Sequence, residues 1–338
     1  MLQERKFFYA GGDPSEIPEV EASGAVYKVH GKPVDPLQAM KDAGFTAVRL
    51  RIWNDPHEHG NFCDLPHTLA LAKRVKAAGL KLMIDFHYSD WWADPGKQFK
   101  PAAWKDLKPE ELRKAIHDYS RDVVKALVDQ DTPPDVVQPG NEVTNGFLWP
   151  EAMLHINGDG WSAFMPLIKA AIAGIREGAG SHPPKIMIHI DQGGRNAISR
   201  FWFDNYFSKG GEADIIGLSY YPFWHGTLEE LQANLKDLAS RYHRDILVAE
   251  TAYPYVRDNS GPGFNPDPIP GYPPTSEGQA AYLRKLTQIV KATPDRRGVG
   301  VLWWAPAWIS APGRNGGWRR LTLFDNSGEA LPALSAFK

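Results

Sequence analysis

Eight short apolar runs, rich in β-branched and aromatic residues, recur along the chain with helix-like segments between them. Strands that alternate with helices in this way form parallel βαβ units. Each run begins apolar and ends with polar or aromatic residues, as a barrel strand does when its carboxyl end opens into a site. The pattern therefore predicts an α/β fold of the (β/α)8 TIM barrel type. The runs cover residues 7–13, 47–53, 81–90, 135–142, 185–194, 215–222, 246–254 and 299–308.

The segments between the runs have the spacing of amphipathic helices. Residues 108–130 carry an apolar stripe at helical period, and a second stripe precedes the seventh run. Residues 65–79 end in Gly79, as helices commonly do. We interpret these stripes as core.

The length of 338 residues is compatible with two domains at about 150 residues each. A TIM barrel, however, takes about 250 residues as one domain, and more where its loops are long. No internal repeat, low-complexity stretch or charge block marks a boundary. We therefore expect residues 1–338 to form a single barrel domain with long βα loops. The Pro/Gly-rich segment 254–274 is predicted to be one of these loops.

Charge and hydropathy narrow the possible partners. The net charge of −2 gives no basic surface, so nucleic acid and anionic membranes are poor candidates. No apolar run approaches the roughly 20 residues of a membrane-spanning helix, and the first residues lack the apolar core of a signal peptide. The single Cys63 excludes an internal disulfide. These features predict a soluble protein, which we expect to be a monomer, with a neutral substrate.

Two glutamates are expected at strand ends that lie nearly opposite each other in the predicted ring. Glu142 closes the fourth predicted strand and Glu250 the seventh, and 250 − 142 = 108 residues corresponds to three βα units of 36. From there two carboxyls can converge to the roughly 5 to 5.5 Å of retaining glycosidases, whereas inverting enzymes need about 6.5 to 9.5 Å. A lone glutamate at a strand end could equally be a solvated or ion-paired residue. The pair, with Asn141 directly before Glu142, favours a retaining glycosidase.

Longer strings narrow this prediction. They are RLRIWNDP, AKRVKAAGLKLMIDFHYSDWWADPGKQ, GNE followed by FLWP, KIMIHIDQGG, GLSYYPF, VAET and LWWAPAWI, and they span the chain from about residue 7 to its end. Together they resemble glycoside hydrolase family 53, the arabinogalactan endo-β-1,4-galactanases. The resemblance implies cleavage of internal β-1,4-galactosidic bonds of galactan, or type I arabinogalactan, through a covalent glycosyl-enzyme. It implies Glu142 as general acid/base, Glu250 as nucleophile, and Asn141 as the ligand of the sugar 2-hydroxyl.

The resemblance also implies a supporting set of residues. Arg51 is expected beside Glu250, keeping it ionised, although strand alternation puts Arg49 on the same side and a structural ion pair for Arg51 stays open. Tyr221 and His87 are expected to form hydrogen bonds around the catalytic pair. For His87 a satisfied core histidine is the alternative.

Tryptophans and aspartates near run ends are candidates for substrate binding. Flat aromatic faces suit sugar rings, although any one tryptophan can belong to the core. The aspartates lie at the ends of the third and fifth predicted strands, where they can bind sugar hydroxyls or cap a helix. In decreasing order of preference the tryptophans are Trp304 and Trp92, then Trp149 and Trp308; the aspartates are Asp90 and Asp191.

No metal or cofactor is expected. His57 and His59 are only two residues apart, which suits no common helical zinc motif. Some bacterial relatives carry calcium in the loop after the last strand, but residues 310–320 are poor in carboxylates here.

Two positions depart from expectation. Ala305 stands where the family more often has glutamate, which is expected to remove a polar group near Trp304. Pro139 donates no ladder hydrogen bond, so the fourth strand is expected to bulge or to end early.

Other functions remain open. A retaining β-1,4-glycanase of the mannanase or xylanase type is the nearest alternative, and a noncatalytic glycan-binding barrel is the alternative outside enzymes. Carbohydrate-degrading enzymes are usually exported. We therefore expect a secreted or periplasmic protein whose signal peptide has been replaced by an initiator methionine.

Overall fold

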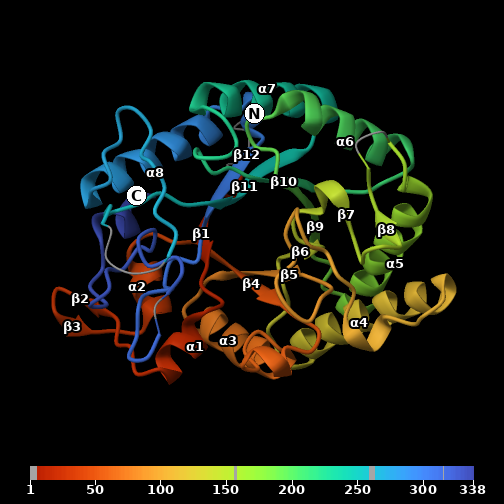
Figure 1. Ribbon diagram of the computed structural model, residues 1–338, viewed down its shortest axis with the longest axis horizontal. Coiled ribbons are helices and arrows are strands. Elements are labelled where there is room, and N and C mark those ends of the chain that lie inside the picture. Colours follow the sequence, from red (N-terminus) through yellow and green to blue (C-terminus); the bar gives the residue numbers. More distant parts are fainter. Residues whose placement is uncertain (1–5, 156–157, 259–262, 315) are drawn as a thin grey trace.

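The computed structural model describes residues 6–155, 158–258, 263–314 and 316–338. Within these residues, eight parallel strands close into a barrel, and each predicted run overlaps one of them (Figure 1). The predicted (β/α)8 fold is confirmed. In order around the ring the strands are β1 (Tyr9–Asp13), β12 (Gly298–Trp304), β11 (Asp245–Thr251), β10 (Ile215–Ser219), β9 (Lys185–Ile190), β6 (Val136–Pro139), β5 (Lys81–Phe86) and β4 (Ala47–Ile52).

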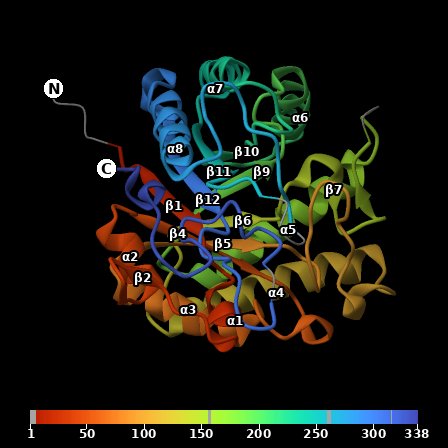
Figure 2. The same cartoon turned by 60° about the vertical axis from the view of Figure 1, so that its left-hand side comes forward.

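Helices surround the barrel (Figures 1 and 2). The predicted helices 65–79 and 108–130 are α3 and α4, and the leucine stripe before the seventh strand is the buried face of α7. The helices are α1 (Ile17–Ala22), α2 (Pro36–Asp42), α3 (Leu65–Ala77), α4 (Pro109–Asp129), α5 (Trp161–Ala179), α6 (Asn196–Ser208), α7 (Leu228–Tyr242) and α8 (Ser276–Lys291). None of the described helices is both long and apolar enough to span a bilayer.

Short elements decorate the loops. Two hairpins pair β2 (Lys28–Val29) with β3 (Lys32–Pro33), and β7 (Gly146–Phe147) with β8 (Ala152–Met153). Short 3₁₀ turns lie at His57–His59, Ala102–Trp104, Val143–Asn145, Pro294–Arg296 and Pro332–Ser335. The predicted loop 254–274 lies between β11 and α8, and its residues 259–262 are outside the described residues.

The barrel interior divides into an apolar and a polar layer. An apolar cluster fills the half nearer the strand starts, with Tyr9, Ala47, Met83, Met187 and Leu247 among its members. Further along the strands, buried polar side chains take over: Asp13, Arg49, Asp85, Gln138, His189, Ser219 and Glu250. The apolar layer closes the barrel, and the polar layer faces the carboxyl ends of the strands.

Local backbone geometry sets the positions of both glutamates. The fourth barrel strand, β6, ends at Pro139 as the proline predicts. Gly140 and Glu142 then adopt positive φ angles of 94° and 47°, which turn the chain sharply at the barrel mouth. On the other side, the pairing of β10 with β11 shifts after Leu218, so that Ser219 lies opposite Glu250. A left-handed turn thus positions Glu142, and a register shift between strands lies next to Glu250.

Candidate active site

A cleft of about 670 Å³ lies at the carboxyl ends of the barrel strands. Its wall contains both predicted catalytic glutamates and several aromatic rings. The lining residues are His87, Trp92, Ala93, Asp94, Pro95, Lys97, Asn141, Glu142, Asp191, Arg195, Tyr221, Trp224, His225, Glu250, Trp304, Trp308, Gly317 and Trp318.

Glu142 and Glu250 meet at the base of this cleft. Their exposed fractions are 8% and 4%, and a carboxylate oxygen of each lies within 4.8 Å of the other and of a ring nitrogen of His189. Such a trio has the spacing of metal ligands, but the guanidinium of Arg49 already contacts Glu250 and would repel a second cation. We therefore read the trio as a proton-transfer site.

Glu250 accepts hydrogen bonds from two donors that favour its carboxylate form. Arg49 Nη2 donates to Oε1 at 2.7 Å, and the Tyr221 hydroxyl donates to Oε2 at 2.9 Å. Burial leaves the pKa of Glu250 above the ordinary value of a glutamate, although the charge and hydrogen bond of Arg49 and the hydrogen bond of Tyr221 lower it. Both oxygens are thereby oriented by donors that prefer the ionised form.

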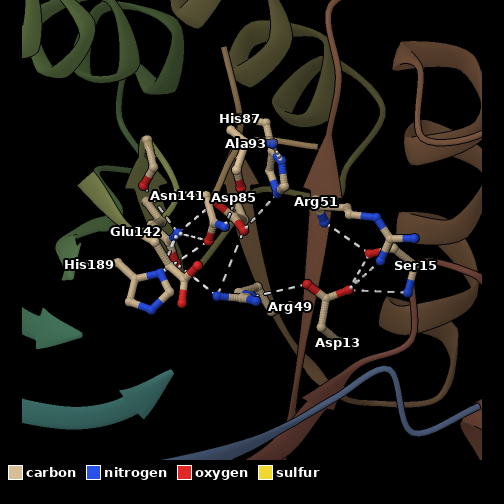
Figure 3. A network of polar contacts seen from close by, with 12 residues as sticks. Asp13, Ser15, Arg49, Arg51, Asp85, His87, Ala93, Asn141, Glu142 and His189 are labelled. Atoms are coloured by element: carbon tan, nitrogen blue, oxygen red, sulfur yellow. Dashed lines mark hydrogen bonds and ion pairs between the residues drawn. The ribbon is translucent and has the colours of Figure 1, made fainter. Parts of the chain in front are cut away.

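The arginine beside Glu250 is Arg49, so the expectation that Arg51 lies there is wrong. Arg51 is instead turned toward the loop after β1, where Nη1 lies 3.5 Å from Asp13 Oδ1 and 3.8 Å from Glu16 Oε2 (Figure 3). Its guanidinium carbon also sits 4.4 Å from the centre of the Trp92 ring. Alternation correctly placed both arginines on the inner side of β4, but Arg49 lies one layer deeper in the barrel and contacts Glu250. Arg51 instead forms an ion pair with Asp13, which is the structural role left open as the alternative in the sequence analysis.

The environment of Glu142 favours the protonated acid. Burial, then the charges of Glu250 and Asp191, raise its pKa well above the ordinary value of a glutamate, and a hydrogen bond from Ser219 opposes the rise. Ser219 Oγ donates to Glu142 Oε1 at 2.5 Å and lies 2.8 Å from His189 Nε2. Burial, followed by the charge of Arg49, holds the pKa of His189 well below its ordinary value, so this imidazole is neutral.

Gln138 connects the surroundings of the two glutamates. Its Oε1 accepts from Arg49 Nη1 at 3.1 Å, and its Nε2 donates to Asp85 at 2.6 Å and lies 3.0 Å from His189 Nδ1. Arg49 also donates from Nε to Asp13 at 3.0 Å. Sequence reasoning missed Arg49, Gln138, His189 and Ser219. The available signal was that polar residues within apolar runs must find buried partners.

Asn141 and His87 both lie in the cleft wall as expected. Asn141 Nδ2 donates to Ala93 O at 2.9 Å, and Oδ1 accepts from Gln138 at 3.2 Å. His87 Nδ1 accepts from Ala93 N at 3.0 Å and from Trp53 Nε1 at 3.3 Å. The proton of a neutral His87 is therefore on Nε2, which lies 3.4 Å from Asp85 Oδ2. His87 thus lines the cleft, and its Nδ1 already accepts hydrogen bonds from the protein.

Three of the four predicted tryptophans line the cleft. Trp92 stacks against Trp308 with ring centres 5.9 Å apart and an angle of 26°, and Trp304 lies at the same wall. Trp318, which the sequence did not single out, meets Trp304 edge-on at 4.6 Å. Trp149 is not part of this wall, and instead packs edge-on against Phe99.

The two predicted aspartates differ. Asp191 lines the cleft and accepts hydrogen bonds from Thr144 and Gln192. Asp90 does not line it, because its two oxygens accept from the backbone N–H groups of Asp55 and Ala102 at 3.0 and 2.7 Å. Since Ala102 begins a 3₁₀ turn, Asp90 has the capping role that was the alternative to sugar binding.

The remaining flagged residues lie apart from the reacting groups. Ala305 is fully buried with a φ of 49° and does not line the cleft. His59 stacks on Trp91, and Cys63 is buried with its Sγ 3.8 Å from Ser15 O. Within the described residues these side chains form no group with metal-ligand spacing.

Comparisons of the sequence and of the structure with known proteins agree on one family. The model of "Glycosyl hydrolase family 53" matches residues 9–337. The chain is 45% identical to an uncharacterized protein of Niallia circulans, over 98% of this chain and 93% of that protein. It is 36% identical to an arabinogalactan endo-beta-1,4-galactanase of Cellvibrio japonicus (strain Ueda107), over 98% and 90% of the two chains. Among solved structures, the Ignisphaera aggregans GH53 catalytic domain superposes with a TM-score of 0.91 at 35% identity, over 100% and 97%.

Proposed function

The chain belongs to glycosyl hydrolase family 53, and we propose from this membership that it is an endo-β-1,4-galactanase that retains anomeric configuration. Its substrate is β-1,4-galactan, including type I arabinogalactan. The single catalytic domain spans residues 1–338.

The pairing of Glu142 with Glu250 carries this proposal. Their oxygens approach within 4.8 Å, which is near the roughly 5 to 5.5 Å of retaining enzymes and leaves no room for the water that an inverting enzyme holds between its carboxyls. One carboxyl has its pKa raised well above normal, and the other is held by a cation and a phenol. This asymmetry is what separate acid and nucleophile roles require.

The first step breaks the glycosidic bond. Glu250 attacks the anomeric carbon and forms a glycosyl ester, while Glu142 gives its proton to the departing oxygen. The ester consumes the charge of Glu250, which is one cause of the raised pKa of Glu142. The pKa of Glu142 therefore falls just as this residue must become a base.

The second step releases the sugar. Glu142 takes a proton from water, the water oxygen attacks the anomeric carbon, and Glu250 leaves as a carboxylate held by Arg49 and Tyr221. Attack from opposite faces in the two steps restores the original configuration. Asn141 keeps one amide hydrogen for the sugar 2-hydroxyl, since its other contact is to Ala93 O.

Separate variants of the two glutamates test the assignment. Glu142→Ala should retain activity on aryl β-galactosides with good leaving groups and should be accelerated by azide, because azide needs no general base. Glu250→Ala should be nearly inactive on every substrate. An equal response of the two variants to azide and to leaving group would contradict the roles. Proton NMR of the first-formed product reports retention directly.

The substrate is tested by product profiles. Linear galactan should yield short oligosaccharides, whereas mannan and xylan should not; the reverse would favour another retaining β-glycanase. Loss of all sugar release in Glu142→Gln and Glu250→Gln excludes a noncatalytic glycan-binding barrel. Because a polysaccharide is too large to enter a cell, we place the enzyme outside the cytoplasm, as a secreted or periplasmic protein.

A further inference from the structure

We infer that Phe99 and Trp149 form a further sugar-binding platform, outside the cleft, that holds the leaving side of the polysaccharide chain. This inference rests on the proposed function and extends it to a subsite beyond the cleft wall. The two rings meet edge-on, with centres 6.1 Å apart. Such a pair offers an apolar surface onto which a pyranose ring can stack.

The Phe99 side chain is exposed to solvent, and hydrogen bonds of the neighbouring residue hold its backbone in place. Its side chain is 61% exposed, more than that of any other large apolar residue identified as exposed in the described chain. The neighbouring Gln98 is buried, and its Nε2 donates to the carbonyl oxygens of Asn141 and Glu142 at 2.7 and 3.4 Å. The segment that presents Phe99 is therefore fastened to the backbone of the acid/base residue.

Trp149 is fixed to the same segment. Its backbone N–H donates to Gln98 O at 2.7 Å, and Phe99 and Trp149 pair as an isolated parallel bridge. The indole Nε1 donates to Asn145 O at 2.8 Å, so the polar edge of the ring is already used. The part of the half-buried ring that remains for a ligand is apolar.

The platform continues the cleft wall. Lys97 and Phe99 each form an isolated β-bridge, and Gln98 between them is buried, so strand-like alternation directs the Lys97 and Phe99 side chains to the same side. Lys97 and Pro95 both line the cleft, and Asn145, which accepts from Trp149, donates to Pro95 O at 2.9 Å. A chain leaving the cleft past Lys97 therefore meets Phe99.

The acid/base residue gives the direction of that chain. Glu142 must face the glycosidic oxygen that departs, so the leaving sugars lie on its side of the cleft. The platform is attached to Asn141 and Glu142 and not to the nucleophile strand β11. Its occupant is thus the reducing-end portion of a long galactan, a neutral chain that needs no charged partner.

The test compares Phe99→Ala on two substrates. Linear galactan has sugars on the leaving side, whereas an aryl β-galacto-oligosaccharide has only the aryl group there. Loss of one stacking contact should lower kcat/KM on galactan by about two- to tenfold, mainly through KM. Turnover of the aryl substrate should not change, and Phe99→Trp should restore wild-type KM on galactan.

Phe7→Ala is the matched control. Phe7 is 45% exposed and precedes β1, at the opposite end of the barrel from the cleft, so its loss should affect neither substrate. Trp149→Phe, which keeps a ring, should retain galactan binding.

The outcomes separate the two proposals. If Phe99→Ala leaves the galactan KM unchanged, or if it weakens both substrates equally, the platform is not a leaving-side subsite, although the galactanase proposal stands. If the wild-type enzyme cleaves the aryl substrate but not galactan, the polysaccharide assignment falls and the platform falls with it.

Discussion

Arg49 and Arg51 both contact Asp13, but of the two it is Arg49 that also contacts Glu250, so their loss should affect different kinetic constants. Arg49 contacts Glu250, whereas Arg51 contacts Asp13 and lies behind the ring of Trp92. The contact of Arg49 lowers the pKa of Glu250. The contact of Arg51 with the Trp92 ring supports a wall of the cleft.

Arg49→Met should move the acidic limb of the kcat/KM profile to higher pH. Arg49 lowers the pKa of Glu250, so without it the nucleophile stays protonated to a higher pH. Loss of a hydrogen bond to a charged group should also reduce kcat by about 10- to 100-fold. Arg51→Met should instead leave the acidic limb in place and raise KM. If Arg51→Met shifted the limb and Arg49→Met did not, the assignment would be reversed.

Ser219→Ala should move the alkaline limb of the same profile upward. The hydrogen bond from Ser219 lowers the pKa of Glu142, so its removal lets the acid hold its proton to higher pH. The acidic limb, set by Glu250, should stay where it is. Ser120→Ala is a suitable control, because Ser120 is also buried and bonded but contacts Tyr88 and α4 only. An unchanged alkaline limb in Ser219→Ala would count against Glu142 as the acid.

Among single residues, sequence reasoning found polar residues at which the apolar part of a run stops, and it missed Arg49, which lies among apolar residues inside β4. Glu142, Glu250, Asn141 and Tyr221 follow or end apolar runs, where a polar side chain calls for explanation. Arg49 does not, because alternation assigns a side of the sheet but not a depth in the barrel. Depth depends on strand tilt and register, which no local pattern encodes.

Among the elements, α4 and α5 pack unusually closely. A Cβ on Gly174 would lie 2.1 Å from His117 O, and one on Gly178 would lie 2.2 Å from Arg121 O. Neither glycine has a positive φ, so both are there for space and not for backbone conformation.

Gly174→Ala should therefore destabilise the enzyme, although alanine is the better helix former by about 1 kcal/mol. The methyl group would force apart two backbones, and overpacking of this kind costs about 1 to 3 kcal/mol. Thermal unfolding monitored by circular dichroism should show a lower Tm. Ala173→Ser, on the exposed face of the same helix, should leave Tm nearly unchanged. A higher Tm for Gly174→Ala would mean that the helices separate freely.

The sequence predicted the elements better than their ends. The fourth run covers residues 135–142, but β6 stops at Pro139 because a left-handed turn follows. The two hairpins, β2 with β3 and β7 with β8, were not predicted, since strands of two residues are too short to show a period. Trp149 lies in the loop that joins β7 to β8, which is why its position outside the cleft wall was not foreseen.

For the molecule as a whole, Glu16 joins the first βα loop to the last. Its Oε1 accepts from Ala307 N at 3.0 Å, and it is fully buried. Burial raises the pKa of Glu16 to about 8, which outweighs the lowering by Arg51, and the charge of Asp13 adds to the rise.

Stability should consequently decline as pH rises from about 4.5 to about 8. In this window the unfolded chain releases the Glu16 proton while the folded protein retains it, so ionisation favours unfolding. Glu142 adds to the same slope. Glu16→Gln cannot ionise and keeps an acceptor for Ala307, so its urea midpoint should fall less steeply over this range. Glu58→Gln, at an exposed site, should parallel the wild type. Parallel curves for Glu16→Gln would show that Glu16 is ionised when folded.

The barrel seam joins the first strand to the last. β1 pairs with β12 over five residues but with β4 over only two. During synthesis, nearly the whole chain must therefore be made before β12, the main pairing partner of β1, is available. A chain truncated before Gly298 would still carry Glu142 and Glu250, but it would leave β1 and β11 as uncovered sheet edges. Such fragments should aggregate after their release from the ribosome and should show no partial activity. Nonsense mutations late in the gene should therefore be as damaging as early ones.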